Sequence, residues 1–203
     1  MPLPVSRSIA HFASTLVFAF VLVFCLPVHA SQSQEVSVTS PDGKLTFTLD
    51  ANGESLRYHI DRVGQAVIAP SSLGLRFGDT AHFAGPLHID SIEKQSVDTQ
   101  WEQPWGEQRI IRDNHNEAFF TFTHSEKPAS VALRVRVFND GIGFRYEGQG
   151  DTDTPLVIMQ EMTEFRFSEP SRTGAWWIPA QGWNRYEYLY RNTTMPEMDR
   201  VHT

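Results

Sequence analysis

The sequence predicts an all-β fold, an antiparallel β-sandwich assembled from many strands. Apolar residues recur at every second position through most of the chain, which is the spacing of a strand with one buried face. No stretch of a dozen residues keeps the three-to-four spacing of an amphipathic helix. The 13 glycines and 12 prolines are spread along the chain and divide it into short segments. Together these observations indicate two packed antiparallel sheets.

Residues 1–30 have the features of a secretory signal peptide. Arg7 precedes an apolar run from Leu16 to Leu26, and the small-residue site Val28-His29-Ala30 follows it. Cleavage is expected between Ala30 and Ser31, and it would place the protein in the bacterial periplasm or outside the cell. The apolar run is shorter than the roughly 20 residues of a membrane span, so no membrane association is expected after cleavage.

The single cysteine and the overall charge narrow the possible partners. Cys25 lies inside the apolar run behind bulky Phe24, whereas a lipid-modified cysteine would follow a small residue. The cleaved chain would therefore have neither a lipid anchor nor a thiol for a disulfide or a metal. The formal net charge is −7 and there is no basic block, which makes nucleic acid and anionic membranes poor partners.

The expected strands follow a polar leader at residues 31–34. Lys44–Leu49 and Leu56–Ile60 alternate on either side of Asn52-Gly53, a pair that favours a tight hairpin turn. Val131–Phe138 alternates apolar residues with arginines, which predicts a half-buried strand with its arginines outward. Asn139-Asp140-Gly141 then turns the chain. The other expected strands are Leu73–Phe77, Leu87–Val97, Glu107–Ile111, Ala118–Thr123, Ile142–Tyr146, Leu156–Phe167 and Trp176–Ile178.

An aromatic run near the end of the sequence encloses one carboxylate and is the first candidate site. Aromatic faces suit the apolar faces of sugars, and a carboxylate among them can coordinate a cation or hydrogen-bond hydroxyl groups. The alternative is an aromatic edge of the core with its carboxylate in solvent. The predicted substrate-binding residues are Trp176, Trp177, Trp183 and Tyr186, and the carboxylate is Glu187.

Other motifs of the sequence could carry chemistry. The loop Trp101-Glu102-Gln103-Pro104-Trp105-Gly106-Glu107 suits either a sugar platform or a rigid corner whose indoles cap one end of the sandwich. Asp140 could serve a cation, although turn chemistry alone explains its motif. The eight histidines lack zinc-ligand spacing, and neither a G-x-S-x-G elbow nor a phosphate-binding glycine loop is present.

Several motifs together resemble the N-terminal domain of glycoside hydrolase family 97, the bacterial exo-acting α-glucosidases and α-galactosidases. The resemblance covers residues 35–203. Its motifs, in order, are Ser40-Pro41-Asp42-Gly43-Lys44, Trp101-x-x-Pro-Trp-Gly-Glu107, Asn139-Asp140-Gly141-x-Gly-Phe144-Arg145-Tyr146 and Tyr186-Glu187-x-Leu-Tyr190.

The resemblance implies a β-super-sandwich related to galactose-mutarotase-like domains, packed against a (β/α)8 barrel that carries the catalytic groups. It also implies that the sandwich contributes one glutamate to an active-site calcium ion, and Glu187 matches that position. A barrel takes roughly 250 residues, which the sequence after Glu187 does not provide. Calcium binding is therefore expected only with a barrel present, supplied in cis or by a split gene.

Three functions remain open at this stage. The first is the sandwich domain of an α-glycosidase, inactive alone, whose partners are an α-linked oligosaccharide and the barrel. The second is a free-standing carbohydrate-binding module that uses the tryptophans Trp101, Trp105, Trp176, Trp177 and Trp183. The third is a purely structural remnant. The sequence does not distinguish gluco from galacto substrates, or retention from inversion of the anomeric configuration.

Overall fold

The computed structural model describes residues 34–51, 55–78, 82–83, 87–124, 127–128, 131–149, 157–179, 187–199 and 201. They form an antiparallel β-sandwich, as the alternating pattern predicts. Within these ranges, no helix is long and apolar enough to cross a membrane. The predicted signal peptide and its cleavage site at Ala30 and Ser31 lie outside the described residues.

The first sheet has the strand order β1-β2-β3-β4-β13, and every neighbouring pair is antiparallel. The β2 to β3 pairing aligns Leu49 with Tyr58 and Ala51 with Leu56, so the hairpin predicted from Asn52-Gly53 is confirmed by its strands. The turn residues themselves lie outside the described ranges. The strands are β1 (Gln34–Thr39), β2 (Leu45–Ala51), β3 (Leu56–Arg62), β4 (Gln65–Leu73) and β13 (Arg166–Phe167).

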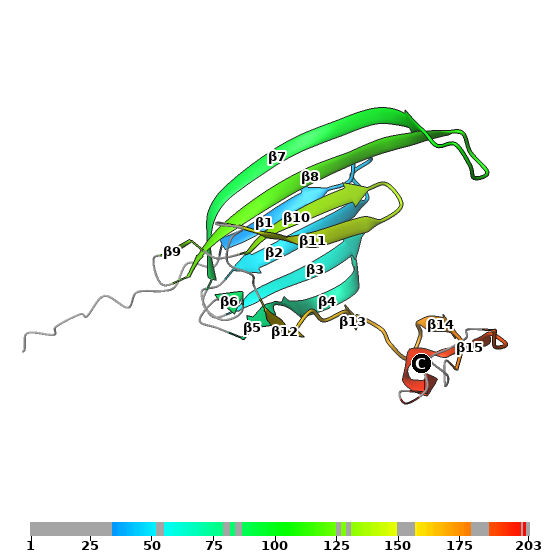
Figure 1. Ribbon diagram of the computed structural model, residues 1–203. Coiled ribbons are helices and arrows are strands. Elements are labelled where there is room, and N and C mark those ends of the chain that lie inside the picture. The colour runs from blue at the N-terminus through cyan, green and yellow to red at the C-terminus, as the bar shows by residue number, and fades with distance from the viewer. Residues whose placement is uncertain are drawn as a thin grey trace, which may run out of the picture. The chain divides into compact units, whose positions relative to one another are not determined.

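The second sheet packs face to face with the first and has the strand order β11-β10-β8-β7, with β9 paired to β8 (Figure 1). Its strands are β7 (Leu87–Glu102), β8 (Ile110–His124), β9 (Lys127–Pro128), β10 (Val131–Phe138) and β11 (Ile142–Gly148). A small third sheet joins β12 (Ile158–Glu161), β5 (Leu75–Phe77) and β6 (His82–Phe83). The last two strands, β14 (Gly174–Trp177) and β15 (Arg191–Thr194), pair with each other, and a 3-10 turn at Met195–Glu197 follows.

The core lies between the two large sheets. Phe47 and Tyr58 from the first sheet are fully buried, as are Phe120 and Leu133 from the second. The ring of Tyr58 meets the edge of the Phe144 ring at a centroid distance of 5.4 Å, which joins the two sheets. The phenol of Tyr58 donates a hydrogen bond of 2.7 Å to the carbonyl of Glu164. Burial raises the pKa of Tyr58 to about 12, so this donor keeps its proton at neutral pH.

Two of the family-like motifs meet at a corner of the sandwich. The Ser40 hydroxyl donates a hydrogen bond of 2.7 Å to Asp42, and Gly43 adopts a positive φ of 72° to close the turn. The amide of Asp42 donates to the side-chain oxygen of Asn139 at 3.0 Å. The motif Asn139-Asp140-Gly141 therefore forms a turn at this corner of the sandwich, as its composition predicts.

The strand pattern differs from the sequence prediction in three respects. The described part of the predicted strand Leu156–Phe167 contains two short strands in different sheets, β12 and β13, with residues 162–165 between them outside any strand. Of the predicted strand Glu107–Ile111, only Ile110 and Ile111 are in a strand, and they belong with the predicted strand Ala118–Thr123 to the continuous strand β8, whereas Glu107 lies in the preceding loop. The strands β1, β4, β6, β9 and β15 were not predicted as separate elements. The β3 to β4 turn explains one omission, because it uses Val63 and Gly64 at positive φ in place of a recognisable turn pair.

Candidate functional site

The C-terminal aromatic segment presents one tryptophan to solvent and buries the next. Trp176 on β14 is 77% exposed, whereas Trp177 is 5% exposed because successive side chains of a strand point to opposite faces. The indole N–H of Trp177 donates to the hydroxyl of Thr193 at 3.0 Å. The guanidinium of Arg191 lies 5.2 Å from the Trp177 ring centroid, a cation–π contact. Trp177 therefore anchors the β14–β15 pair.

Tyr190 completes the exposed aromatic surface around Trp176. The two rings are 6.1 Å apart between centroids, and Tyr190 is 75% exposed. Glu187 is also exposed. Trp183 and Tyr186, predicted to bind substrate, lie outside the described residues. The structure thus brings Trp176 together with Tyr190, which sequence reasoning treated only as a neighbour of Glu187.

The described residues offer no complete metal site. They contain no group of three or more histidine, cysteine, aspartate or glutamate side chains that could hold a metal ion. Calcium requires about six to eight oxygen ligands, and the exposed carboxylate of Glu187 supplies at most two of them. The residues of this segment fit calcium only as a shared site, with the other ligands coming from elsewhere.

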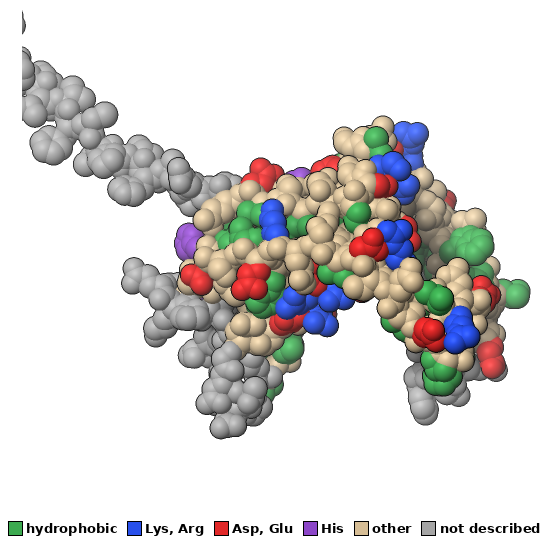
Figure 2. Space-filling view, turned by 90° about the horizontal axis from the view of Figure 1, so that it is seen from above, with side chains coloured by type: hydrophobic (Ala, Val, Ile, Leu, Met, Phe, Trp, Pro, Cys, Tyr) green, Lys and Arg blue, Asp and Glu red, His purple; other side chains and the backbone are tan. Residues whose placement is uncertain are grey.

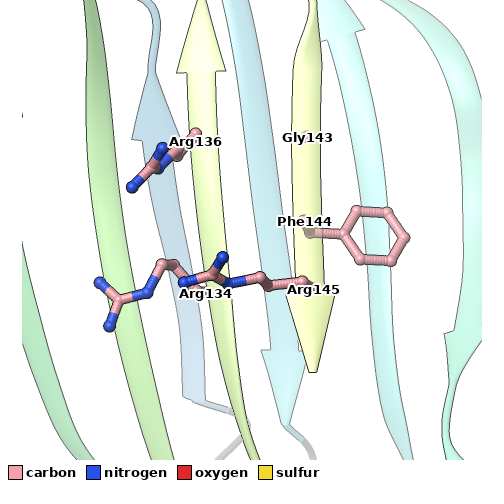
Figure 3. A pocket seen from close by; sticks show the side chains of 5 residues that line it. All are labelled: Arg134, Arg136, Gly143, Phe144 and Arg145. Atoms are coloured by element: carbon pink, nitrogen blue, oxygen red, sulfur yellow. The ribbon is translucent and has the colours of Figure 1, made fainter. Parts of the chain in front are cut away.

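A second feature is a small cavity on the outward face of the second sheet. It has a volume of about 200 Å³, and Figure 3 shows Arg134 and Arg136 of β10 and Arg145 of β11 around it. Gly143 leaves the gap, since no side chain stands between the arginines on that strand. The outward direction of the β10 arginines agrees with the alternation in the sequence.

The arginines of this face are held by two glutamates. Glu117 on β8 is 2% exposed, and its carboxylate accepts hydrogen bonds of 2.6 Å from Arg134, 2.6 Å from Arg136 and 2.7 Å from Gln95. Burial acts to raise the pKa of Glu117, but these hydrogen bonds outweigh it and lower the pKa. Glu147 accepts from Arg134 at 2.6 Å, and this bond is the largest cause that lowers its pKa to about 2.

This network neutralises most of the local charge. Arg145 also donates a hydrogen bond to Glu147, at 2.7 Å. The sequence did not identify Glu117, because it lies between two predicted strands and only the structural register places it opposite Arg136. Positive and negative side chains also lie next to each other on the face seen in Figure 2. The arginines around the cavity are therefore paired with glutamates, and these ion pairs hold strands β8, β10 and β11 together.

The third feature is the end of the long β7–β8 hairpin, called here the arm tip and consisting of residues 102–109. Trp105 in this loop is 82% exposed, and Trp101 just before it is 51% exposed. Neither indole is buried, so the interpretation that both cap an end of the sandwich does not hold. A cavity of about 660 Å³ opens beside Trp105, lined by polar and charged side chains of the loop.

A fourth feature is an apolar strip on and around β12, consisting of five large exposed side chains. Between two-fifths and three-fifths of each side chain is accessible. A cluster of this kind within nine residues is typical of a surface that a protein partner covers. Its members are Val157, Ile158, Met159, Met162 and Phe165.

Comparison with known proteins gives a consistent picture. The family model described as Glycosyl-hydrolase 97 N-terminal matches residues 38–203. A retaining alpha-galactosidase of Bacteroides thetaiotaomicron is 22% identical over 193 residues, which cover 91% of this chain and 28% of that protein. A probable retaining alpha-galactosidase of Streptomyces bingchenggensis is 29% identical over 167 residues, covering 79% of this chain and 25% of that protein.

Solved structures extend the comparison. A variant of a glycoside hydrolase family 97 enzyme from Pseudoalteromonas sp. strain K8, in complex with panose, has 36% sequence identity and a TM-score of 0.72. The match covers 80% of this chain and 25% of that chain. The enzyme in complex with acarbose gives 37% identity and the same TM-score of 0.72, covering 79% of this chain and 24% of that chain. The present chain spans about a quarter of the length of these relatives.

Proposed function

The chain belongs to the Glycosyl-hydrolase 97 N-terminal family, and we propose that it is the carbohydrate-associated sandwich domain of an exo-acting α-glycosidase. The substrates would be α-glucosides or α-galactosides, the latter in line with the names of the two alpha-galactosidases. In this proposal the domain packs against a catalytic (β/α)8 barrel, and Glu187 contributes its carboxylate to an active-site calcium ion. The chain alone would not hydrolyse glycosides.

The observation that carries the proposal is the exposure of Glu187 three residues before Tyr190, whose ring lies against that of Trp176. An isolated domain gains nothing in stability from leaving Trp176 and Tyr190 in water, because burying an aromatic side chain is favourable. The same groups suit the rim of a sugar site, where rings cover the apolar faces of a pyranose and a carboxylate fixes a cation.

The apolar strip supports the packing part of the proposal. Single exposed apolar residues are normal on a protein surface, but here five exposed apolar side chains lie close together in the sequence around β12. Covering them with a barrel would remove this area from water, and each buried apolar Å² contributes roughly 25 cal/mol. The strip is the surface through which we expect the sandwich to hold the catalytic part.

A chimera tests the role of Glu187. The N-terminal domain of the Pseudoalteromonas enzyme would be replaced by residues 34–203, and panose hydrolysis would be measured against calcium concentration. Glu187→Gln should raise the half-saturating calcium concentration by about tenfold or more, because it removes one charged ligand. Glu169→Gln is the matched control: this exposed glutamate pairs with Arg172, and its loss should leave the calcium response unchanged.

Two results would contradict the proposal. An unchanged calcium response in Glu187→Gln would remove that residue from the metal site. Turnover of an aryl α-glucoside by the 203-residue chain alone would show that the chain carries its own catalytic groups. Retention of native stability in each variant, measured by thermal unfolding, separates loss of the ligand from loss of the fold.

A second candidate is a carbohydrate-binding module that acts without hydrolysis. The exposed indoles of Trp105 and Trp176 favour it, because solvent-facing indoles are suitable platforms for sugar rings. The chimera distinguishes the two functions: a binding module would neither restore panose hydrolysis nor respond to calcium.

A further inference from the structure

The arm tip is a loop closed by its own hydrogen bonds. The amide of Gln103 donates to the carbonyl of Arg109 at 3.0 Å, and its side-chain NH2 donates to the carbonyl of Gln108 at 2.7 Å. Gly106 has a φ of 112°, and a Cβ at this position would lie 2.7 Å from the Gln103 side-chain nitrogen. Glycine is therefore required for the Gln103 side chain to close the loop.

The closed loop holds its side chains in a suitable arrangement for a ligand. Trp105 is 82% exposed beside a cavity of about 660 Å³, within the roughly 300–1,000 Å³ usual for small-molecule sites. The guanidinium of Arg109 lies 3.2 Å from the carboxylate of Glu102, and both side chains are exposed. The cavity lining also includes Gln103, Pro104 and Glu107.

We propose that the arm tip is a second carbohydrate-binding site, which takes one pyranose ring of an α-linked oligosaccharide on the indole of Trp105. The apolar C–H face of the ring would lie against the indole. The carboxylates of Glu102 and Glu107 accept hydrogen bonds from sugar hydroxyls, and Arg109 donates them. The proposal rests on the carbohydrate association proposed above and adds a site at a different place in the chain.

The surroundings of Trp105 favour a sugar over a protein partner. The apolar strip combines five neighbouring apolar side chains, which is the composition of a protein-covered surface. The cavity at the arm tip instead sets a single indole among two glutamates, one glutamine and one arginine. Pyranose rings have an apolar face with hydroxyl groups around it, so this mixture matches their chemistry.

The hydrogen bonds that close the arm tip also affect the expected affinity for a ligand. A loop that is already closed by its own hydrogen bonds loses little conformational freedom when a ligand binds. A single ring on one indole gives few contacts, so a dissociation constant in the millimolar range is expected, which corresponds to about −4 kcal/mol. Such a site holds polymeric or oligomeric substrate near an enzyme by adding to a stronger site.

The test uses the full 203-residue chain labelled with 5-fluorotryptophan. Its five tryptophans give separate fluorine resonances that single Trp→Phe variants assign. Panose and maltotriose would be titrated to high millimolar concentration. The Trp105 resonance should shift and saturate, and Glu102→Gln combined with Glu107→Gln should weaken binding by about tenfold, or about 1.4 kcal/mol in total, because a neutral amide oxygen is a weaker acceptor than a carboxylate.

Several outcomes would overturn the proposal. No shift of Trp105 at saturating sugar, or a shift confined to Trp176, would exclude a site at the arm tip. A Trp105 resonance that changes with protein concentration in the absence of sugar would indicate a protein contact in place of a sugar site. These results are independent of the calcium response of Glu187, so failure here leaves the proposed function standing.

Discussion

The two halves of the β7–β8 hairpin differ in what holds their side chains. In the half that belongs to the sandwich, β8 pairs with β10 from His115 to Phe120 as well as with β7. Glu117 there is 2% exposed and bonded on three sides. In the outer half, the register pairs β7 and β8 only with each other, and Trp105 at the arm tip is 82% exposed.

The difference shows where this fold can change its surface. Side chains of the inner half have several partners each, so replacing one leaves other buried groups unsatisfied. Side chains of the outer half have few partners, and the strand pairing that carries the loop depends on backbone hydrogen bonds. A binding site at the arm tip can therefore be altered with little effect on the stability of the sandwich.

The largest expected effect distinguishes two glutamates of this hairpin. Glu117→Gln keeps the shape but removes the charge that Arg134 and Arg136 share, and we expect a loss of about 2–3 kcal/mol in the free energy of unfolding. Glu102→Gln at the arm tip removes an exposed partner of Arg109 and should change it by less than about 0.5 kcal/mol. Urea denaturation of both variants measures the contrast. Equal losses would show that the two halves are held alike.

Acid should weaken the ion pairs of β10 and β11, on the same face of the sheet as Glu117. Arg134 and Arg145 lower the pKa of Glu147 from its ordinary 4.5 to about 2, so the folded protein binds its proton less readily than the unfolded chain. The resulting stability is present above pH 4.5 and is lost as the pH falls toward 2. Its size is about 2 kcal/mol after allowance for partial exposure of the side chain.

Denaturation at pH 7, 4 and 3 tests this dependence. The natural chain should lose stability over this range, and Glu147→Gln should flatten the loss, because it has no carboxylate to protonate. Glu102→Gln serves as the control and should keep the full dependence. If Glu147→Gln leaves the acid response unchanged, other carboxylates govern it.

The sequence predicted the strands of the sandwich well where apolar and polar residues alternate and the apolar ones are buried. The expected strand Val131–Phe138 has the bounds of β10, since its alternation is unbroken and a turn motif ends it. Strand β8 appeared as two runs because residues 112–117 contain no apolar side chain. The structure explains that gap, because Glu117 in this stretch is buried although it is charged. Its carboxylate accepts hydrogen bonds from arginines on the next strand, and the alternation of apolar residues does not reveal such a buried ion pair.

The candidate sites were predicted in part for a related reason. The aromatic run near Glu187 was recognisable from composition, and Trp176 and Glu187 are exposed as a site requires. The exposure of Trp105 was not predictable, because a loop indole is buried or exposed according to which distant segments cover it. The opposite states of adjacent Trp176 and Trp177 follow from strand geometry once β14 is known.

The smallest expected effect concerns the turn between β3 and β4, which contrasts with the arm tip. The arm tip uses Gly106 at its positive φ of 112°, whereas this turn places Val63 at a φ of 50°. A β-branched side chain is strained in the left-handed region, where asparagine is better tolerated. Val63→Asn should therefore raise the free energy of unfolding by about 1 kcal/mol.

A matched control isolates the backbone contribution at Val63. Val67 on β4 is also a solvent-exposed valine, but it lies in extended backbone, where asparagine is less favourable than valine. Val67→Asn should thus leave stability unchanged or lower it, and thermal unfolding of the two variants gives the sign of each effect. A gain in both would point to lower surface hydrophobicity as the cause. A gain at Val63 alone shows that the turn stores strain, which the glycine at the arm tip avoids.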